Sequence, residues 1–342
     1  QDTRNLGGIA FLQLRDITGV IQLTLLKKKL GDENFKSWAN INRESIILVR
    51  GIVKENEEAP GGVEMLPDNI ELMNEAETPL PLGVIDKIDS EIETRLNARY
   101  LDLRKTEIAA NFQIRAAISG AVHKHLRREN FLEVQTPKII ASATEGGTSL
   151  FEMKYFDKTA YLAQSPQLYK QMLMSGGLER VYEVGPAFRA EEHNTPRHLN
   201  EFISIDIEMS FADDDVVMGV MERLIATAAR TVSKETKALK TLGIEPIELE
   251  LPLPRITYDE AVEMAKGKAK WGEDLSMEAT RAIAEQMNGF YFITKWPLSL
   301  KPFYIQPDDD PKYSKGFDFM YNEIEMTSGG QRVHDVNLLR ER

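Results

Sequence analysis

The chain has 342 residues, a mass of 38.8 kDa, and 42 lysine and arginine residues against 54 aspartate and glutamate residues, which gives a formal net charge of −12. This acidic balance excludes a polybasic nucleic-acid coat but allows a local nucleic-acid site, and the length suits about two domains. Cysteine is absent, which excludes disulfides, thiolate metal sites and cysteine nucleophiles, and no apolar run approaches the roughly 18 residues of a membrane span, so we expect a soluble, cytoplasmic protein.

The first 75 residues are predicted to form a small β-barrel. They contain short alternating or β-branched runs, bounded by turn residues, at 9–16, 19–25, 45–54 and 69–73. About five short strands in a segment of this length, of which these runs supply four, are typical of an OB-type barrel, whose open face binds single-stranded nucleic acid. The pattern fits equally well a barrel that only packs against its neighbour.

An acidic, proline-containing stretch, EAETPLPL at 75–82, follows the barrel and cannot propagate a helix. We therefore place the barrel at 1–74, a linker at 75–93 and a second domain at 94–342. A helical apolar rhythm runs over 108–130, and beyond it strand-like and helical segments alternate without the regular spacing of a doubly wound sheet. This predicts an α+β domain with a largely antiparallel sheet, in which 234–289 is a mixed insertion at the periphery.

The sequence contains no G-x-G-x-x-G, no G-x-x-x-x-G-K-[ST] and no H-E-x-x-H, so none of these motifs identifies a ligand. The charged stretch around His193 and His198 allows three interpretations. It could hold zinc, but Arg189 and Arg197 beside it would repel a dication. Arginines flanked by acids suit a triphosphate better, because guanidinium groups hold phosphate oxygens and carboxylates hold Mg²⁺. The third interpretation is a solvated charged turn.

Five segments, in order along the chain, resemble the signatures of one family. FLEVQTP at 131–137 is similar to motif 1 of the class II aminoacyl-tRNA synthetases, and FRAEE at 188–192 with RHLNEF at 197–202 is similar to their motif 2. Three further segments resemble the substrate- and metal-binding segments of the archaeal and eukaryotic-like aspartyl-tRNA synthetases: TEGGTSLF at 144–151, QSPQLYKQ at 164–171 and IEMTSGGQR at 324–332. The resemblance covers nearly the whole chain, the barrel included.

The resemblance implies an ATP-dependent ligase that converts L-aspartate to aspartyl-adenylate and transfers the aspartyl group to tRNA-Asp, with tRNA-Asn left open as a second acceptor. It also implies Mg²⁺, and a homodimer whose contact includes the helix at 108–130 and the segment at 131–137. Two other functions remain open. One is an enzyme on the same fold that makes asparagine without tRNA, against which the barrel counts. The other is a tRNA-binding module whose catalytic half is incomplete.

The positions of the family's ATP site carry over onto this sequence. Arg189, the catalytic residue that the resemblance implies, would hold the α-phosphate and the substrate carboxylate through the transition state. Glu325 and Ser328 would hold Mg²⁺ with hard oxygen ligands. The remaining ATP-binding positions are Glu191, facing the adenine, and Arg197, His198 and Leu199 in the motif 2 loop.

The positions of the family's amino-acid site carry over in the same way. Lys170 would hold the side-chain carboxylate of aspartate as a point charge and Arg332 would hold it as a bidentate fork. A neutral amide facing Lys170 would leave a buried charge unpaired, so asparagine would be rejected. Without the resemblance, Lys170 would be assigned to an exposed helix face. The other implied aspartate-binding residues are Glu145 and Asp206 at the α-ammonium, and Gln167, Arg189 and Ser328.

In the barrel, the resemblance makes Phe11 a stacking platform for an anticodon base and Gln22 a reader of a base edge. Taken alone, Phe11 would be assigned to the core. The lysines at 27–29 would supply positive charge for phosphates. Pro60 lies in the turn that bears on acceptance of tRNA-Asn, where discriminating archaeal enzymes tend to carry lysine, so Pro60 favours the relaxed type.

The sequence departs from the family pattern at its ends. It starts at Gln1, after the expected first barrel strand, and it contains no G-x-G-x-x-x-R of motif 3, whose arginine packs against ATP. We expect the natural protein to contain these segments, in which case its intact mass exceeds 38.8 kDa.

Overall fold

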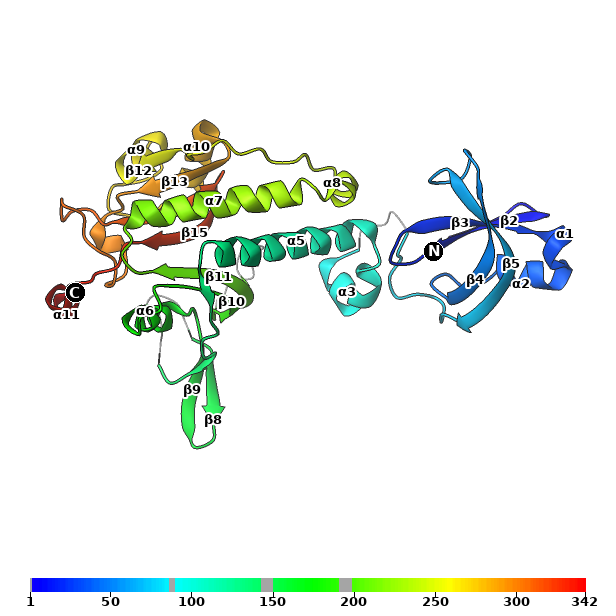
Figure 1. Ribbon diagram of the computed structural model, residues 1–342, viewed down its shortest axis with the longest axis horizontal. Coiled ribbons are helices and arrows are strands. Elements are labelled where there is room, and N and C mark those ends of the chain that lie inside the picture. The colour runs from blue at the N-terminus through cyan, green and yellow to red at the C-terminus, as the bar shows by residue number, and fades with distance from the viewer. Residues whose placement is uncertain (1, 86–89, 143–149, 191–198) are drawn as a thin grey trace. The chain divides into compact units, whose positions relative to one another are not determined.

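The computed structural model describes residues 2–85, 90–142, 150–190 and 199–342, and it divides into two compact units, Gln1–Gln113 and Ile114–Arg342 (Figure 1). The border between the units falls within one long helix, α5 (Thr106–Arg128), which lies within two residues of the helix predicted at each end. Within the described residues, no helix is both long and apolar enough to cross a bilayer.

Unit 1 contains a five-stranded sheet in which every pairing is antiparallel except that of β3 with β5. The strand order is β1-β2-β3-β5-β4. The bounds are β1 (Thr3–Asn5), β2 (Ile9–Arg15), β3 (Val20–Leu26), β4 (Ile46–Glu55) and β5 (Val63–Asn74). The predicted runs therefore lie on β2 to β5, but β5 begins earlier than predicted. Pro67 interrupts the strand pattern of β5 and lies opposite Gly51 at a register shift between β4 and β5. A side chain at Gly51 would collide with the backbone of β5.

The barrel core follows the alternation of β2 and β3. Ala10, Leu12, Leu23 and Leu25 point inward, and Phe35 from α2 packs onto them. Unit 1 also contains helices that the sequence pattern did not predict, because they are short or strongly charged: α1 (Lys27–Leu30), α2 (Asp32–Ala39), α3 (Ile92–Asn97) and α4 (Arg99–Asp102).

The described residues of unit 2 form three small sheets, with strand orders β11-β10-β6, β12-β13-β14-β15 and β7-β9-β8. Only β6–β10 and β12–β13 pair in parallel, so the predicted largely antiparallel arrangement is confirmed for the described residues. The strands are β6 (Leu132–Glu133), β7 (Ile139–Ile140), β8 (Glu152–Tyr155), β9 (Lys158–Leu162), β10 (Arg180–Phe188), β11 (Glu201–Met209), β12 (Arg255–Thr257), β13 (Phe290–Thr294), β14 (Gly316–Tyr321) and β15 (Ile324–Gly330). The helices are α6 (Gln167–Ser175), α7 (Asp214–Val232), α8 (Thr236–Leu242), α9 (Tyr258–Met264), α10 (Met277–Met287), the 3-10 turn η1 (Leu298–Leu300) and α11 (Val336–Glu341).

Helix α7 packs against two of these sheets at once. It begins at the side chain of Asp213, which accepts a hydrogen bond from the backbone N–H of Val216. Val220 packs with Tyr182 of β10, while Met218 packs with the aromatic side chains of β13 and β14. The helix therefore covers one face of both sheets and leaves their opposite faces free to form a site.

The segment 234–289 is more than a peripheral insertion. Its second half supplies β12, which pairs with β13, and helices α9 and α10, whose residues Tyr258 and Ile283 are fully buried against Tyr291 and Ile293. The periodicity of this segment is masked by its many small and charged residues, so its alanines were not recognised as a close-packed face.

Candidate functional site

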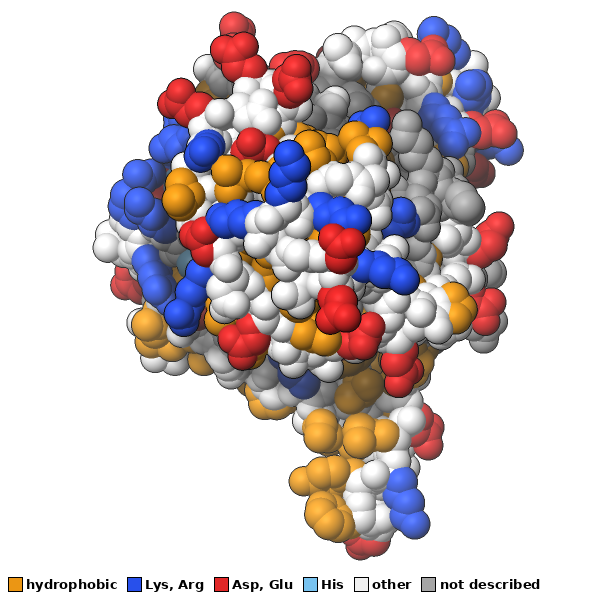
Figure 2. All heavy atoms as spheres, turned by 90° about the vertical axis from the view of Figure 1, so that its right-hand side faces the viewer, with side chains coloured by type: hydrophobic (Ala, Val, Ile, Leu, Met, Phe, Trp, Pro, Cys, Tyr) orange, Lys and Arg blue, Asp and Glu red, His pale blue; other side chains and the backbone are white. Residues whose placement is uncertain are grey.

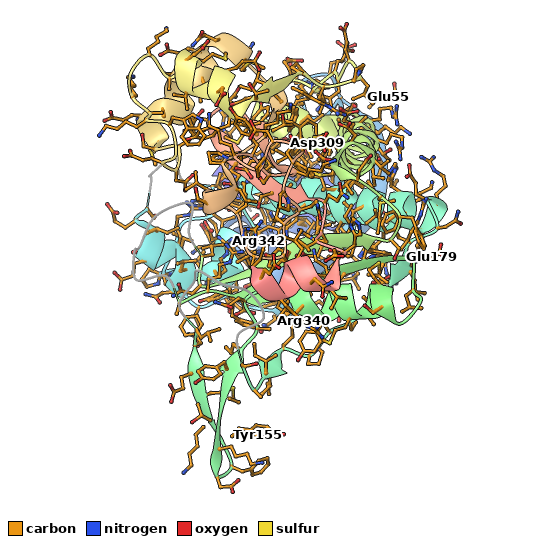
Figure 3. The ribbon with its side chains drawn as sticks, turned by 90° about the vertical axis from the view of Figure 1, so that its left-hand side faces the viewer. Glu55, Tyr155, Glu179, Asp309, Arg340 and Arg342 are labelled. Carbon is orange, nitrogen blue, oxygen red and sulfur yellow. The ribbon has the colours of Figure 1, made fainter. Side chains whose placement is uncertain are left out.

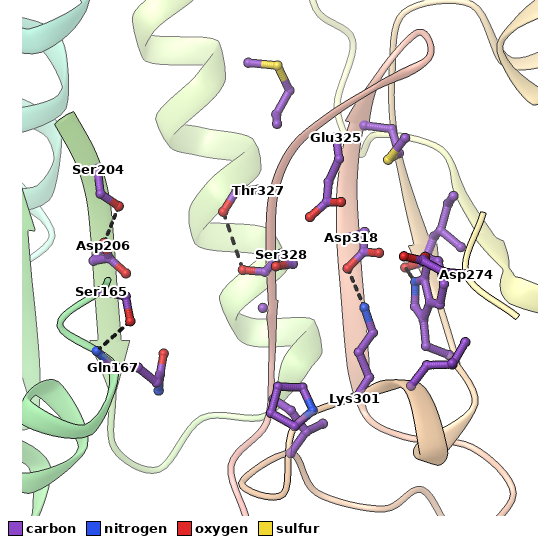
Figure 4. A pocket seen from close by; sticks show the side chains of 18 of the residues that line it. Ser165, Gln167, Ser204, Asp206, Asp274, Lys301, Asp318, Glu325, Thr327 and Ser328 are labelled. Carbon is purple, nitrogen blue, oxygen red and sulfur yellow. Dashed lines mark hydrogen bonds and ion pairs between the residues drawn. The ribbon is translucent and has the colours of Figure 1, made fainter. Parts of the chain in front are cut away.

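A pocket of about 970 Å³ lies in unit 2 between β11 and β15 (Figure 4). Because successive side chains of a strand point to opposite faces of its sheet, the pocket and helix α7 lie on opposite faces. On β14, Phe317 and Phe319 pack toward α7, whereas Asp318 and Met320 line the pocket. On β11, Ile207 packs into the helix-covered core, while its neighbours of opposite parity, Ser204 and Asp206, face the pocket. The volume is at the upper end of the range for small-molecule sites.

Lys170 enters this pocket from helix α6. Gln167 and Lys170 are one helical turn apart and therefore share a face of the helix. Only 8% of the Lys170 side chain is exposed, and its Nζ donates to Oδ1 of Asp206 at 2.9 Å and to the carbonyl of Ile207 at 3.2 Å. The structure thus places Lys170 inside the site, with its charge matched by a carboxylate on β11.

Arg332 reaches the same cluster from the segment after β15. Its Nε and Nη2 donate to the two oxygens of Glu208 at 2.9 and 3.3 Å, and Nη2 also donates to Oε1 of Gln167 at 3.1 Å. The buried Glu208 carboxylate lies 3.6 Å from Nζ of Lys170 as well. One carboxylate therefore fixes both cations that the resemblance assigns to the aspartate side chain.

The polar groups of this cluster are arranged for a charged ligand. Burial pushes the pKa of Asp206 upward, but the Lys170 ammonium and the hydrogen bonds from Ser204 and Lys170 outweigh it, so the pKa lies below its ordinary value. Asp206 is therefore an anion at neutral pH. The Nε2 group of Gln167 is buried and has no hydrogen-bond partner among the described residues, which leaves one amide donor for a ligand.

Arg189 lines the same pocket directly after β10. Its backbone N–H donates to the carbonyl of Asn200 at 3.0 Å, and its guanidinium lies over the ring of Phe202 with 5.4 Å between Cζ and the centroid. The Nε group of Arg189 is buried and lacks a hydrogen-bond partner within the described ranges. A guanidinium fixed by stacking with an unused donor is suited to an anionic oxygen.

A second cluster lies on the opposite wall, on β14 and β15. Ser328 is the register partner of Asp318, so both side chains lie on the pocket face. Glu325 is three residues from Ser328 and would point to the other face of a regular strand. A register shift between Phe319 and Met320 places an extra residue in β15 and returns Glu325 to the pocket face.

Both carboxylates of this cluster have a raised pKa. Partial desolvation, followed by repulsion from Asp318, raises the pKa of Glu325 to about 7, although the side chain is open to solvent through the wide pocket. Burial likewise raises the pKa of Asp318, against the attraction of Lys301, whose Nζ lies 2.7 Å from Oδ1. Two adjacent carboxylates and a hydroxyl are hard oxygen ligands with excess negative charge, so these residues fit a Mg²⁺ ion that water and phosphate oxygens complete. No cluster of three or more His, Asp or Glu ligands occurs in the part of the chain that the structure describes.

The structure therefore gathers in one pocket the following predicted residues: Gln167, Lys170, Arg189, Leu199, Asp206, Glu325, Ser328 and Arg332. Four further predicted residues, Glu145, Glu191, Arg197 and His198, lie outside the described residues, as does His193 of the zinc interpretation. Leu199 is exposed at the pocket rim.

Sequence reasoning missed Glu208, Asp318 and Lys301. Glu208 follows Asp206 by two residues in a strand with period-two alternation, and this spacing is a signal that both side chains share a face. Asp318 is a lone acid within the aromatic run GFDFMY, a pattern that marks a buried charge with a function. Lys301 carries no comparable sequence signal.

The predicted nucleic-acid residues lie in unit 1. Phe11 lies opposite Thr24, and Gln22 lies opposite Gln13, on the face of β2 and β3 that points away from the core residues Ala10 and Leu12. The structure thus places Phe11 outside the core, as a stacking role requires. Pro60 is exposed in the turn between β4 and β5.

The lysines at 27–29 are partly neutralised. Lys27 pairs with Asp32, and Lys29 pairs with Asp68. Figure 2 shows further lysine and arginine side chains over the barrel unit, interspersed with acidic and apolar ones. The side of the molecule that Figure 2 shows is therefore mixed in charge rather than uniformly basic.

Comparison with known proteins agrees with this geometry. The family described as tRNA synthetases class II (D, K and N) matches residues 91–342, and the OB-fold nucleic acid binding domain matches residues 1–73. The chain is 51% identical to the aspartate–tRNA(Asp/Asn) ligase of Archaeoglobus fulgidus, over 99% of this chain and 80% of that protein. It is 47% identical to the aspartate–tRNA(Asp) ligase of Thermoplasma acidophilum, over 100% of this chain and 80% of that protein.

The fold matches solved structures of the same class. Asparaginyl-tRNA synthetase from Pyrococcus horikoshii complexed with asparaginyl-adenylate superimposes with a TM-score of 0.92 at 32% identity, covering 99% of this chain and 80% of that one. The predicted fold class, an OB-type barrel followed by a class II catalytic domain, is confirmed, while the predicted domain borders stay predictions. With the match over residues 91–342 and half-identical relatives along the whole chain, the chain belongs to the aspartate–tRNA ligases of the class II tRNA synthetase family.

Proposed function

We propose that this protein charges both tRNA-Asp and tRNA-Asn with L-aspartate at the expense of ATP. The observation that carries the proposal is the cluster of Lys170, Glu208 and Arg332, which presents two cations in the same pocket as Arg189 and the carboxylate pair. Two fixed cations suit an acidic amino-acid side chain, and Arg189 in the same pocket suits a phosphate.

The reaction has two steps. A carboxylate oxygen of aspartate attacks the α-phosphorus of ATP, and pyrophosphate leaves. The 3′-terminal hydroxyl of the tRNA then attacks the carbonyl of aspartyl-adenylate, its proton is lost, and AMP leaves. The protein forms no covalent bond in either step, so its contribution is positioning and charge stabilisation.

Lys170 and Arg332 bind the side-chain carboxylate of aspartate, and Glu208 holds both cations in place. Asp206, with Glu145, binds the α-ammonium group. Gln167 contributes its unused amide donor, and Ser328 its hydroxyl. Asparagine presents a neutral amide to these two cations and is therefore rejected, because its NH2 group cannot accept the hydrogen bonds that a carboxylate oxygen accepts.

Arg189 binds the α-phosphate and stabilises the negative charge that develops there as the bond to pyrophosphate breaks. Glu191 faces the adenine, and Arg197, His198 and Leu199 meet the rest of the nucleotide. Asp318, Glu325 and Ser328 hold Mg²⁺, which neutralises charge on the phosphate oxygens when bound. Desolvation and, after it, repulsion from Asp318 raise the pKa of Glu325, and a bound dication would relieve that repulsion, which supports this assignment.

The barrel binds the anticodon through Phe11 and Gln22. Pro60 supports a relaxed choice between the two tRNAs, and so does the name of the Archaeoglobus relative, while the Thermoplasma relative is named for tRNA-Asp alone. Charged tRNA is consumed by the ribosome, so the proposal includes a cytoplasmic location.

We also propose a homodimer built through α5 and the strands that follow it. Apolar side chains are exposed along this region, including Ile118, Leu132 and Ile139. The β8–β9 hairpin projects from unit 2, with Tyr155 near its far end (Figure 3) and Phe156 80% exposed beside it. Sedimentation equilibrium on the protein and on Leu132→Glu tests the dimer, which the substitution is expected to weaken.

The function is tested by charging tRNA-Asp and tRNA-Asn transcripts with aspartate at one stated salt concentration. Comparable charging of both supports the proposal, and charging of tRNA-Asp alone overturns the relaxed specificity. Aspartate-dependent pyrophosphate exchange with asparagine formation and no charging would indicate the tRNA-independent enzyme. Binding of tRNA with no exchange would indicate an incomplete module.

A further inference from the structure

Lys301 has no place in the proposed chemistry, yet it is built into the wall of the site. Its side chain is 13% exposed, and its Nζ donates to Oδ1 of Asp318 at 2.7 Å (Figure 4). Only 8% of the Asp318 side chain is exposed. Lys301 and Asp318 therefore form a buried ion pair rather than a surface contact.

The Lys301 side chain is confined along its length. Its ammonium lies 4.2 Å from the ring centroid of Trp296, which is itself buried and fixed by a hydrogen bond to the carbonyl of Ile293. The stem also lies so close to Gly316 that a Cβ added to this glycine would stand 3.2 Å from Cγ of Lys301. Confinement of the stem directs the ammonium at Asp318.

The same carboxylate belongs to the pair that we assign to Mg²⁺, so the inference rests on that part of the proposed function. A dication and an ammonium next to one carboxylate repel each other, and the repulsion is strong where water is excluded. Lys301 therefore competes electrostatically with a metal ion at Asp318. Nucleotide phosphates would tip the balance, because they bring negative charge and further oxygen ligands.

We propose that Lys301 is an internal counter-cation that neutralises Asp318 and keeps the carboxylate pair from binding a divalent cation tightly until nucleotide phosphates arrive. The pair then takes its metal together with ATP rather than before it. Lys301 therefore acts through Asp318 on the order in which the metal ion and ATP bind, and it does not need to touch the reacting atoms.

The experiment measures Mn²⁺ binding to the full-length protein by loss of the free-ion EPR signal, with and without ATP. Lys301→Met removes the charge and keeps an apolar stem against Trp296. Lys301→Gln is the second variant, in case the methionine variant does not fold. Lys312→Met is the matched control, because Lys312 also lies over a tryptophan ring, with 4.1 Å to the centroid of Trp271, but outside the pocket.

Without ATP, we expect Lys301→Met or Lys301→Gln to bind Mn²⁺ at least about tenfold more tightly than the unchanged protein, while Lys312→Met binds as the unchanged protein does. Adding Glu325→Gln to Lys301→Met should abolish the gain, which places the ion at the carboxylate pair. With ATP present, the difference in Mn²⁺ affinity between the unchanged protein and the Lys301 variants should become smaller.

Two results would overturn the inference in distinguishable ways. In the first, the unchanged protein binds Mn²⁺ in the presence of ATP, but without ATP the folded Lys301 variants bind Mn²⁺ no more tightly than the unchanged protein does. The metal site would then stand, and the proposed role of Lys301 would be refuted. If neither the unchanged protein nor the variants bind Mn²⁺ under any condition, the assignment of the carboxylate pair to a metal falls, and the inference falls with it.

Discussion

The carboxylate of Glu208 accepts hydrogen bonds from both Nε and Nη2 of Arg332, at 2.9 and 3.3 Å. Glu208 belongs to β11 and Arg332 follows β15, so this ion pair joins the two walls of the pocket. Lys170 shares the same carboxylate at 3.6 Å. The geometry of the two cations that we propose to bind aspartate therefore depends on one residue that need not touch the substrate.

Glu208→Gln is expected to weaken aspartate binding. The amide keeps the size of the side chain but removes the charge that holds Arg332 and Lys170, and loss of one member of a buried charge pair costs about 2 kcal/mol or more, or roughly 30-fold in binding. The measurement is the KM for aspartate in ATP–pyrophosphate exchange.

Glu222→Gln is the control for Glu208→Gln. Glu222 is a similarly buried glutamate in the same unit, and it pairs with Arg255 away from the pocket. We expect this variant to lose stability while its KM for aspartate stays unchanged. An unchanged KM in Glu208→Gln as well would show that Glu208 has no part in organising the site.

Lys170→Met is expected to reduce the preference for aspartate over asparagine. The buried ammonium is the group that a neutral amide cannot satisfy, so removing it relieves the penalty against asparagine. The same change weakens the binding free energy of aspartate by about 2–5 kcal/mol. Exchange rates with the two amino acids give the ratio. Lys138→Met is the comparison, because Lys138 pairs with buried Glu183 but does not line the pocket. A preserved ratio in Lys170→Met would refute its role in specificity.

Much of the fold followed from sequence pattern, because strand alternation and the apolar rhythm of the long helix are local signals. Alternation identified the barrel strands β2 and β3, and the apolar rhythm identified α5 to within two residues. The resemblance supplied most of the site. The sequence could not show that Glu325 and Ser328 face the same pocket, because their spacing of three needs the β-bulge that only the paired strand reveals.

Pairings between distant segments were also hidden from the sequence. Lys301 follows η1 directly and meets Asp318 of β14 while its ammonium lies over the ring of Trp296, and no local pattern encodes these contacts. The contribution of 255–289 to the core was missed for a similar reason. Its alanines become a packing face only when α9 and α10 meet β13.

Gly329→Ala is expected to destabilise unit 2. A Cβ at this position would stand 2.6 Å from Cζ of Phe317, whose ring is fully buried and cannot move aside freely. Overpacking of this kind costs about 1–3 kcal/mol, and it would be measured as a fall in the midpoint of urea unfolding. Gly120→Ala is the matched control. Gly120 lies on the exposed face of α5, where a Cβ would meet nothing within 4 Å. Alanine at this position should therefore raise the free energy of unfolding by up to about 1 kcal/mol. Equal midpoints for the two variants would contradict the close contact at Phe317.

The stabilising effect of Mg²⁺ is expected to depend on pH through Glu325. Its pKa rises from an ordinary value of 4.5 to about 7 in the folded protein, so without metal the folded state binds more protons than the unfolded state between these values. The contribution of Glu325 to stability therefore falls as pH rises from about 4.5 to about 7, since the folded carboxylate must lose its proton against desolvation and the charge of Asp318.

Mg²⁺ requires the deprotonated form, so its binding releases this proton. The rise in Tm on adding Mg²⁺ with ATP should therefore be small near pH 5.5, grow with pH, and level off above about pH 7. Chelation with EDTA should remove it at every pH. Thermal unfolding of Glu325→Gln at the same pH values is the decisive comparison, because glutamine cannot titrate and binds the cation weakly. A Mg²⁺-dependent rise in Tm that is independent of pH, or that survives in Glu325→Gln, would place the metal elsewhere in the site.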